Sequence, residues 1–428
     1  MRTDSWLRAG TALVLALFLC FPAAAQSSSL DPQDLALLKK IERDTFQYFT
    51  RMSDKETGLT RDSSRPGSPA SIAATGFSLA ALAIGADNKW IPETWARDTL
   101  RKTLKNLLSK AQHEKGFFYH FLDPRSSRRV WTSEASSIDT ALLIAGALVA
   151  AQYYPGTEIE RMAHDLYERV EWDWMLNGTD MICMGWKPES GFLPYYWDTY
   201  NEHLIIQALA IGSPTHPVGK DVWNAWQRLE DDYNGHHIVY AHSGSLFTYQ
   251  FPQAFIDFRN LDDAGINYYE NSKAASLANR EYSLSFRQTH KSYSEFSWGL
   301  SASVGPGGYK AYGSKPGEGL QDGTIAPYAA IGSILFTPRE SMDAIRFFYT
   351  QYEKELYGHF GFKDAFNLDK RWWADEYIGI DQGITLLMLE NFLNDGAIWK
   401  RFMKLKAVQD WLQKCKLAEN ASKVTPSS

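Results

Sequence analysis

The chain has 428 residues, and 44% of them are hydrophobic, so it can bury a large core. Its formal net charge is −6, which argues against a nucleic-acid partner because such a partner requires a basic surface. Glycine- and proline-rich stretches occur as single loops, so the sequence indicates one large domain rather than two domains joined by a linker.

The first 25 residues are predicted to be a secretory signal peptide. Arg2 and Arg8 give a basic start, residues 9–21 form an apolar run too short to span a bilayer comfortably, and residues 23–25 offer a small-residue cleavage site. An uncleaved membrane anchor is the alternative. We therefore expect a periplasmic or secreted protein with no membrane contact after cleavage, whose oligomeric state stays open.

After this segment, amphipathic helices alternate with apolar helices that are rich in small residues. Asp31 is the expected cap of the first helix, and Pro32 its first residue. Apolar residues at three- and four-residue steps predict amphipathic helices at 32–52, 92–111, 157–170, 222–229, 264–283 and 338–357. Apolar partners are predicted at 71–84, 136–151, 200–211, 246–258, 325–335 and 383–393.

Six such pairs predict an all-α (α/α)6 barrel, because a helix that is apolar on all sides must be buried inside helices that are apolar on one side. The barrel is predicted to occupy residues 26–417 as a single domain. A last amphipathic segment at 398–416 would pack over the closure, and residues 418–428 form a polar tail. The loops that lead into the inner helices would open at one end of the ring, where we expect the functional site.

Many aromatic residues fall in these loops. A sugar ring has apolar C–H faces and polar edges, so it binds by stacking on aromatic rings with hydrogen bonds around its rim. The competing interpretation is that aromatic residues fill the core, which suits Trp90, Trp95, Trp223 and Trp226 on helix patterns. The aromatic residues of the loops are Trp131, Trp186, Tyr195, Tyr196, Trp197, Trp298, Tyr309, Trp372 and Trp373.

Carboxylates in the same loops suit the cleavage of a glycosidic bond, in which one carboxyl protonates the leaving oxygen and another activates water or attacks the anomeric carbon. Glu202 stands out because it begins an apolar helix directly after an aromatic loop, where burial would raise its pKa as a general acid requires. Asp139 could instead be an ordinary residue of a helix cap. The carboxylates considered are Asp62, Glu134, Asp139, Glu189, Asp198, Glu202, Asp322, Asp364, Asp375, Glu376 and Asp381.

We expect no cofactor and no metal ion. Cys183 and Cys415 are the cysteines of the predicted mature chain, and the sequence contains no Cys-x-x-Cys motif. The stretch GPGG at 305–308 lacks the following lysine and the preceding strand that a phosphate-binding loop needs.

Several long stretches carry a family resemblance. They lie between about residues 41 and 402 and include PASIAATGFSLAALAIG, GFFYHFLD, MGWKPESGFLPYYWDTYNEHLI, WGLSASVGPGGY, HFGFKDAFN and DEYIGIDQGITLLMLEN. Together they resemble the bacterial glucoamylase-like domain family, whose members include the β-1,2-glucanases of glycoside hydrolase family 144. The resemblance implies an (α/α)6 barrel that hydrolyses a β-1,2-glucan oligo- or polysaccharide, either internally or from an end with release of sophorose.

The resemblance also implies roles for particular residues. It places the general acid at Glu202 and the opposing carboxylate among Asp375, Glu376 and Asp381, of which we favour Asp375 as the base. The family commonly has two aspartates where this chain has Asp375 followed by Glu376, so the choice within this turn stays open.

Further residues are expected at the same site. Glu134 and Asp139 resemble the family's additional acids near the cleavage point, and Trp372 is expected to line the pocket. We expect inversion at the anomeric carbon, because a wide mouth leaves room for water between the two carboxyl groups. The other implied substrate-binding residues are Arg61, Asp62, Trp186, Lys187, Tyr195, Trp197, Asp322 and Lys363.

Other classes of function are weighed against this one. A polysaccharide lyase on a helical toroid would usually have a basic cleft, whereas the predicted mouth is acidic. A non-catalytic glycan-binding protein would need no desolvated pair of carboxyl groups. A toroid that acts on a prenyl diphosphate would need an aspartate-rich magnesium motif, which the sequence lacks.

Overall fold

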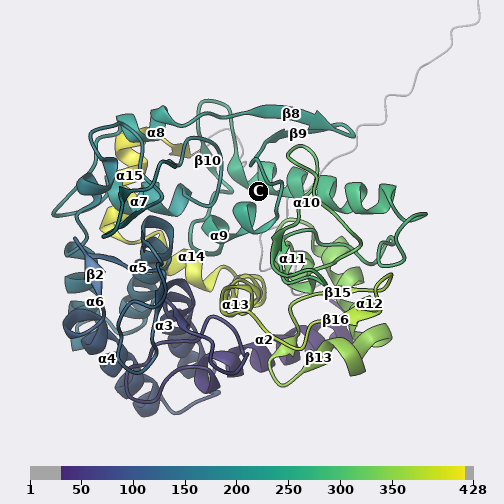
Figure 1. Cartoon of the computed structure of the whole chain (residues 1–428), viewed down its shortest axis with the longest axis horizontal. Helices are drawn as coiled ribbons and strands as arrows, with labels where there is room; N and C mark the ends of the chain where they lie inside the picture. Colours follow the sequence, from purple (N-terminus) through teal and green to yellow (C-terminus); the bar gives the residue numbers. More distant parts are fainter. Residues whose placement is uncertain (1–29, 420–428) are drawn as a thin grey trace, which may run out of the picture.

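The protein, described here by a computed structural model of residues 30–419, contains two concentric rings of helices (Figure 1). The inner ring consists of α3 (Ile72–Asp87), α5 (Ser137–Tyr153), α7 (Leu204–Ile211), α9 (Phe247–Phe255), α11 (Pro327–Gly332) and α13 (Gly379–Leu393). The outer ring consists of α2 (Pro32–Arg51), α4 (Glu93–Ser109), α6 (Glu158–Glu168), α8 (Asp221–Ala225), α10 (Tyr268–Ser285) and α12 (Pro338–Leu356). Each inner helix contacts the next, and α13 contacts α3, so the ring is closed. The predicted all-α barrel is confirmed.

The inner helices are buried because they have no continuous polar face. In α3, every residue from Ile72 to Gly85 is buried, and α5 is buried over most of its length. Small residues allow the two backbones to touch: a Cβ atom on Gly146 would lie 1.9 Å from the carbonyl oxygen of Gly76. Burial of this apolar surface is the main favourable contribution to folding.

The outer helices bury only one stripe of their surface. In α2, Leu38, Ile41 and Phe49 lie on the buried face. Asp31 caps this helix as predicted, because its carboxylate accepts a hydrogen bond from the Gln33 N–H at 2.8 Å.

Four helix boundaries predicted from the sequence are wrong by four residues. The helix predicted at 264–283 begins at Tyr268, and the helix predicted at 383–393 begins at Gly379. The helix predicted at 200–211 begins at Leu204, because the residues before it form a turn. The helix predicted at 222–229 ends at Ala225, because Trp226 is extended and the next residue pairs with Thr199. Periodicity alone does not mark either of these last two changes.

The segment predicted as a single helix at 398–416 is two helices, α14 (Ala397–Phe402) and α15 (Lys406–Cys415). α14 contacts α5, α9 and α13, whereas α15 packs beside α7, so the chain turns between them. Ala418–Glu419 then forms β17, which pairs with β10 (Leu261–Asp262), so the ordered domain extends past the predicted end at residue 417. The predicted signal peptide and the remainder of the tail lie outside the described residues.

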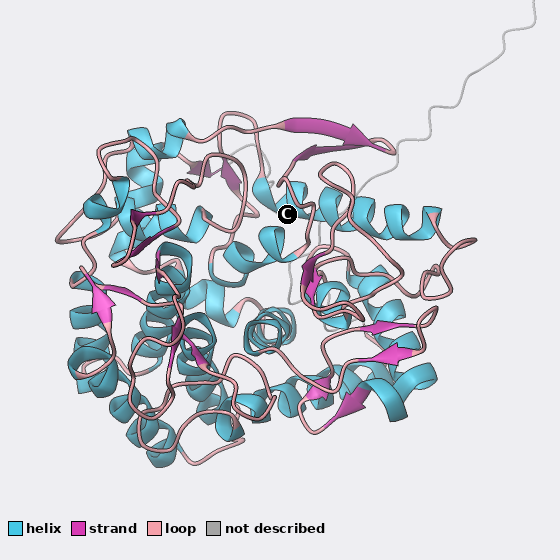
Figure 2. Ribbon diagram, viewed as in Figure 1, coloured by secondary structure: helices cyan, strands magenta, loops and turns pink. Residues whose placement is uncertain are grey.

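Strands of two to four residues lie among the helices (Figure 2). One 3-10 turn, η1 (Trp172–Leu176), follows α6. Within residues 30–419, none of the helices is long and apolar enough to cross a membrane. The remaining strands are β1 (Ala70–Ser71), β2 (His113–Glu114), β3 (Phe117–Phe118), β4 (Phe121–Leu122), β5 (Ala135–Ser136), β6 (Gly185–Lys187), β7 (Gly191–Phe192), β8 (Glu230–Tyr233), β9 (His236–Val239), β11 (Ala302–Ser303), β12 (Lys310–Ala311), β13 (Tyr357–Gly358), β14 (Gly361–Phe362), β15 (Phe366–Asn367) and β16 (Trp372–Trp373).

The strands join loops that lead into different inner helices. β1 pairs with β4, which connects the loop before α3 to the loop before α5, and β5 pairs with β6, which connects the loops before α5 and α7. Single bridges between Ser63 and Ile378 and between Ile325 and Phe366 connect the loops before α3, α11 and α13. These loops therefore meet at one end of the barrel, as the alternation of helices predicts.

A buried pair of carboxyl groups links the two rings near the C-terminal end of α13. Glu42 of α2 is 3% exposed and Glu390 of α13 is 1% exposed. Glu390 accepts hydrogen bonds from the side-chain amides of Asn88 and Asn394 at 3.0 and 2.8 Å. Burial raises the pKa of Glu42 well above its usual value, and the charge of Glu390 beside it raises this pKa further. The folded chain therefore favours a protonated Glu42 that shares its proton with Glu390.

This pair predicts a pH-dependent gain in stability for Glu42→Gln. Because the pKa of Glu42 is raised in the folded state, its contribution to stability is complete below the unfolded pKa and is lost as pH rises through the folded pKa. The amide keeps a donor for Glu390 and cannot ionise. We expect Glu42→Gln to raise the free energy of unfolding by about 1–2 kcal/mol at pH 8 and to leave it unchanged at pH 4.

Thermal and urea unfolding at the two pH values measure this effect. Glu355→Gln is the matched control, because Glu355 is exposed on outer helix α12. Equal stability of Glu42→Gln and the wild type at pH 8 would contradict the shared proton.

Candidate active site

Three of the predicted carboxyl groups lie at the N-terminal ends of inner helices. Asp139 is in the first turn of α5, Asp381 is in the first turn of α13, and Glu202 lies two residues before α7. All three residues are buried. The partial positive charge of a helix N-terminus stabilises a carboxylate, whereas burial disfavours its charge, so these groups are under opposing influences.

Glu202 is the carboxyl group whose burial matters most. It is 8% exposed, and its Oε2 atom has no hydrogen-bond partner among the described residues. Burial raises its pKa to about 7, and the charge of Asp139 adds to the increase. The raised pKa favours a protonated Glu202 near neutral pH, which is the state that a general acid needs.

Aromatic packing holds the segment that carries Glu202. The Trp197 indole N–H donates to the Ser137 hydroxyl at 2.9 Å, which ties the aromatic loop to α5. His203 lies between Trp197 and Trp226, with ring centroids 5.9 and 5.0 Å away. Burial lowers the pKa of His203 to about 3, so its ring is neutral and adds no charge beside Glu202. Trp197 is 6% exposed, so most of its ring packs within the loop, and its role in substrate binding stays a prediction.

His120 connects two further acids. Its Nδ1 atom is 3.1 Å from Glu134 Oε1, and its Nε2 atom is 3.6 Å from Asp139 Oδ1. Burial alone would lower the pKa of His120, but the charge of Asp139 and the contact with Glu134 outweigh it and raise the pKa to about 9. Burial would raise the pKa of Glu134, but the contact with His120 outweighs burial and holds this pKa below its usual value. An imidazolium between two carboxylates is therefore the state at neutral pH.

Asp139 has a second role in the start of its helix. The Ser136 hydroxyl donates to Asp139 Oδ2 at 2.5 Å and accepts from the Asp139 N–H at 3.2 Å. The Ser136 hydroxyl therefore caps α5, and the Asp139 carboxylate orients this hydroxyl. Ser136 and not Asp139 is thus the N-cap of α5, and Asp139 accepts from the Ser136 hydroxyl with one oxygen while it faces His120 with the other.

His120, Glu134 and Asp139 are also the group of residues that could hold a metal ion among those that the structure describes, with ligand atoms within 4.8 Å of one another. The two imidazole nitrogens face different carboxylates, so one ion cannot replace both contacts. A protonated imidazole is not a ligand. The geometry fits an ion-pair triad better than a metal centre.

A second group of acids lies around the start of α13. Asp364 and Asp381 are 2% exposed and hydrogen-bonded to each other. Burial raises the pKa of Asp364 to about 6, whereas burial and the charge of Asp364 raise the pKa of Asp381 well above its usual value. Burial also raises the pKa of Asp62 to about 6, despite the opposing charge of His120. Glu376 is 4% exposed and forms an ion pair with Arg65.

The two groups of acids belong to one cluster. The charges of Asp139 and Glu376 both act on Asp62, and those of Asp381 and Glu202 both act on the phenol of Tyr309. A charge shifts the pKa of another group only when the two groups lie within about 10 Å of each other. The cluster therefore comprises Asp62, His120, Glu134, Asp139, Glu202, Tyr309, Asp364, Glu376 and Asp381.

Two predicted acids, Asp375 and Asp322, are more exposed than the carboxyl groups at the helix N-termini. Asp375 is exposed, although it adjoins the buried Glu376. Asp322 accepts hydrogen bonds from Thr324 Oγ1 at 2.6 Å and Tyr312 at 3.0 Å, and Lys310 lies 3.3 Å away. Its pKa is lowered because these contacts outweigh burial.

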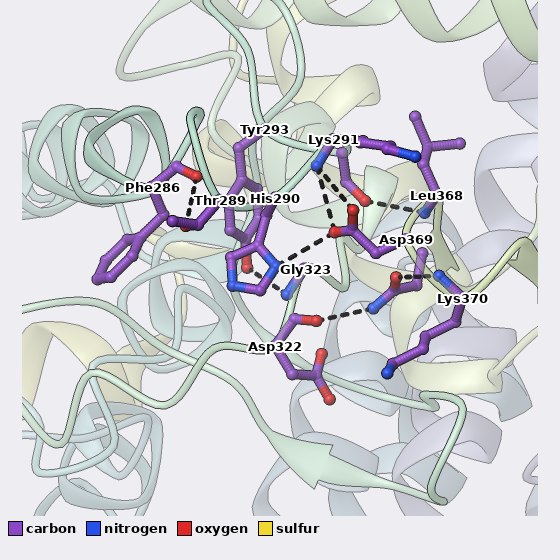
Figure 3. A network of polar contacts seen from close by, with 12 residues as sticks. Phe286, Thr289, His290, Lys291, Tyr293, Asp322, Gly323, Leu368, Asp369 and Lys370 are labelled. Carbon is purple, nitrogen blue, oxygen red and sulfur yellow. Dashed lines mark hydrogen bonds and ion pairs between the residues drawn. The ribbon is translucent and has the colours of Figure 1, made fainter.

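Contacts with neighbouring segments hold the loop that carries Asp322. Figure 3 shows His290 facing Asp369 at 3.1 Å, while the Tyr293 hydroxyl accepts from the Gly323 N–H at 3.0 Å. A Cβ atom on Gly323 would lie 2.8 Å from Asp369, so a glycine is required there. This network positions the Asp322 loop.

The remaining predicted residues vary in exposure. Tyr195 is 63% exposed, and Trp186 and Trp372 are half-buried on β6 and β16. Arg61 donates from Nη1 to the Ser68 carbonyl at 2.6 Å, so its guanidinium braces its own loop. Lys187 is near enough to Glu134 to lower the pKa of that carboxyl, and Lys363 is half-buried in the turn before Asp364.

Sequence reasoning did not consider His120 and Arg65, and it considered Tyr309 only as one of the aromatic residues of the loops. His120 lies between aromatic residues in the stretch GFFYHFLD, and that position is the signal that could have identified it. Arg65 lies in a glycine- and proline-rich loop and carries no comparable signal.

A helical barrel with a carboxyl cluster at the entrance to its inner helices defines the class of α/α-barrel glycoside hydrolases. Residues 194–406 match the family model described as "Putative glucoamylase". A solved structure from Bacteroides uniformis with the same description is 30% identical, with a TM-score of 0.85 over 90% of this chain and 98% of that one. The chain therefore belongs to the glucoamylase-like family.

Two further relatives have named activities. The endo-β-1,2-glucanase from Chitinophaga pinensis, solved with sophorotriose and glucose, is 28% identical, with a TM-score of 0.84 over 90% of this chain and 98% of that one. An exo β-1,2-glucooligosaccharide sophorohydrolase from Parabacteroides distasonis is 27% identical over 89% of this chain. This chain spans 58% of the length of that sophorohydrolase.

The imidazolium triad predicts that His120→Ala destabilises the protein in a pH-dependent way. The pKa of His120 is raised from 6.5 to about 9 in the folded state, so its contribution is complete below pH 6.5 and is lost as pH rises through about 9. We expect a loss of about 1–2 kcal/mol near pH 6.5, after allowance for partial exposure.

Urea unfolding between pH 6.5 and 10 measures this loss. His237→Ala is the control, because His237 also lies 3.0 Å from two carboxylates but is 63% exposed. A deficit for His120→Ala that does not shrink by pH 10 would refute the triad.

Proposed function

We propose that this chain hydrolyses β-1,2-glucan with Glu202 as the general acid. The observation that carries this proposal is the buried Glu202 carboxyl, whose pKa of about 7 favours a proton near neutral pH, whereas the pKa of Glu134 is lowered. The named activities of the Chitinophaga and Parabacteroides relatives support β-1,2-glucan as the substrate. Residues 1–25 support export to the periplasm or beyond, and this part of the proposal rests on sequence alone.

The proposed mechanism is a single displacement with inversion. Glu202 transfers its proton to the glycosidic oxygen, the bond from this oxygen to the anomeric carbon breaks, and the leaving sugar departs as an alcohol. A water molecule attacks the opposite face of the same carbon and gives its proton to a carboxylate. The Glu202 carboxylate and the protonated base exchange protons with solvent to complete the cycle.

The base is assigned to the Asp364–Asp381 pair acting as one unit. Two hydrogen-bonded buried carboxyls titrate together and carry one negative charge when a single proton is shared. Asp364 is oriented by the Val304 N–H, which donates to it at 2.7 Å. Asp375, which the sequence favoured, is exposed and is therefore better suited to binding the sugar at the rim than to activating water in a desolvated site.

The first test replaces the acid. Glu202→Gln keeps the shape of the side chain but has no proton of suitable acidity, so we expect turnover of β-1,2-glucan to fall by about 10²–10⁴-fold with little change in substrate affinity. Reducing-sugar release and product sizing measure turnover and distinguish internal cleavage from release of sophorose. NMR of the fresh product reports the anomeric configuration.

Asp198→Asn is the matched control, because Asp198 is an exposed carboxylate in the same loop. Near-normal turnover by Glu202→Gln, or a product with retained β configuration, would refute the mechanism. Tight binding without hydrolysis by the wild type would identify a glycan-binding protein instead.

The pKa values predict a narrow bell-shaped pH profile. The base must be ionised, so kcat/KM should fall below the pKa of about 6 for Asp364. The acid must be protonated, so kcat/KM should fall above the pKa of about 7 for Glu202. We expect a maximum between pH 6 and 7, measured on a soluble β-1,2-glucan at constant ionic strength. An alkaline limb above pH 9 would exclude Glu202 as the titrating acid.

A further inference from the structure

Exposed aromatic rings are concentrated at one end of the barrel. Among the described residues, Trp131, Tyr195 and Tyr309 are the large hydrophobic side chains that are more than half exposed, at 70%, 63% and 55%. They lie in the loops that lead into α5, α7 and α11. An exposed aromatic ring in water is unfavourable unless a ligand covers it, so this distribution points to a ligand with apolar faces.

Trp131 is the most exposed of the three, and a series of rings links it to the carboxyl cluster. Its ring packs edge-on against Phe121, with centroids 5.2 Å apart. Phe121 in turn stacks on His120 at 3.9 Å and an interplanar angle of 16°. His120 contacts Glu134 and Asp139. Trp131 therefore lies two rings outward from the imidazolium triad.

The backbone of Trp131 adopts a conformation that tryptophan rarely takes. Its φ is +55°, in the left-handed region that favours glycine or asparagine. A strained backbone persists only where the surrounding structure imposes it, and it often marks a functional site. Because the side chain is mostly exposed, core packing does not explain why tryptophan occupies this position.

The loop around Trp131 is held rigidly. The Val130 N–H donates to the Phe121 carbonyl at 3.1 Å, and Arg129 Nε donates to the Ser133 carbonyl at 2.5 Å. Arg129 also pairs with both oxygens of Glu189, at 2.6 and 3.0 Å. A ring presented by a rigid loop binds a ligand with little loss of conformational entropy.

We propose that Trp131 is a stacking platform for a glucose ring that lies outside the catalytic carboxyls. The inference rests on the proposed function and assigns a distal binding position for a neutral glucan chain. The apolar face of one glucose unit would cover the indole while the chain continues inward toward Glu202. Trp131 thus contributes to the binding of long chains and not to the chemical step.

The test compares long and short β-1,2-glucooligosaccharides. We expect Trp131→Ala to raise KM about tenfold for chains that reach the platform, the equivalent of about 1.4 kcal/mol, and to leave kcat unchanged. Oligosaccharides too short to span the distance should show unchanged KM and kcat. Trp131→Phe should retain part of the affinity. Trp95→Ala is the matched control, because Trp95 is 42% exposed on outer helix α4.

A second variant distinguishes binding from a structural role. Trp131→Gly removes the ring and relieves the positive φ, so we expect its melting temperature to equal or exceed that of the wild type while its KM for long chains rises. A lower melting temperature, or an equal effect on short and long chains, would overturn the platform. If the wild type hydrolyses β-1,2-glucan and Trp131→Ala has the same KM and kcat for all chain lengths, the proposed platform is refuted and the proposed function stands. If the wild type hydrolyses none, titration of tryptophan fluorescence with the same oligosaccharides tests the platform separately.

Discussion

Closure of the inner ring is the constraint on which the rest of the structure depends. α3 and α5 approach so closely that neither Gly76 nor Gly146 leaves space for a side chain, and α13 contacts α3 to complete the circle. Helices this close must carry small apolar residues, which is why the inner segments are rich in alanine and glycine. Closure also brings the loops before the inner helices to one end, so residues far apart in the sequence share one site.

The electrostatics of the site follow from this closure. The ring places carboxyl groups at helix N-termini inside a protein core, where burial opposes their charge. The increase in the pKa of Glu202 from 4.5 to about 7 corresponds to a cost on the order of 3 kcal/mol when it ionises. Two other acids have cationic partners that offset the cost of burying their charge: His120 contacts Glu134 and lowers its pKa, and Arg65 pairs with Glu376. Acids with different proton affinities thus lie in one cluster, as acid–base chemistry requires.

Aromatic residues divide into two populations that the composition does not separate. Trp197, Trp223 and Trp226 are buried and brace the turn before α7 and the short α8. Trp131 and Tyr195 are exposed on the loops at the entrance. The first population supplies rigidity, because buried rings fix the segment that carries Glu202. The second supplies surface that a sugar ring can cover.

The sequence by itself determined the order and type of the helices, because the presence or absence of a polar face is a local property of each segment. It also predicted the burial of Glu202, since an acid at the entrance of an apolar helix is buried with that helix. It could not show that Asp381 and Trp197 are buried while Asp375 and Trp131 are exposed, because the direction of a side chain depends on the folded backbone around it. The contact of His120 with Glu134 and Asp139, and the shared proton of Asp364 and Asp381, were decided by tertiary structure alone, because each joins separate loops or elements whose approach depends on ring closure.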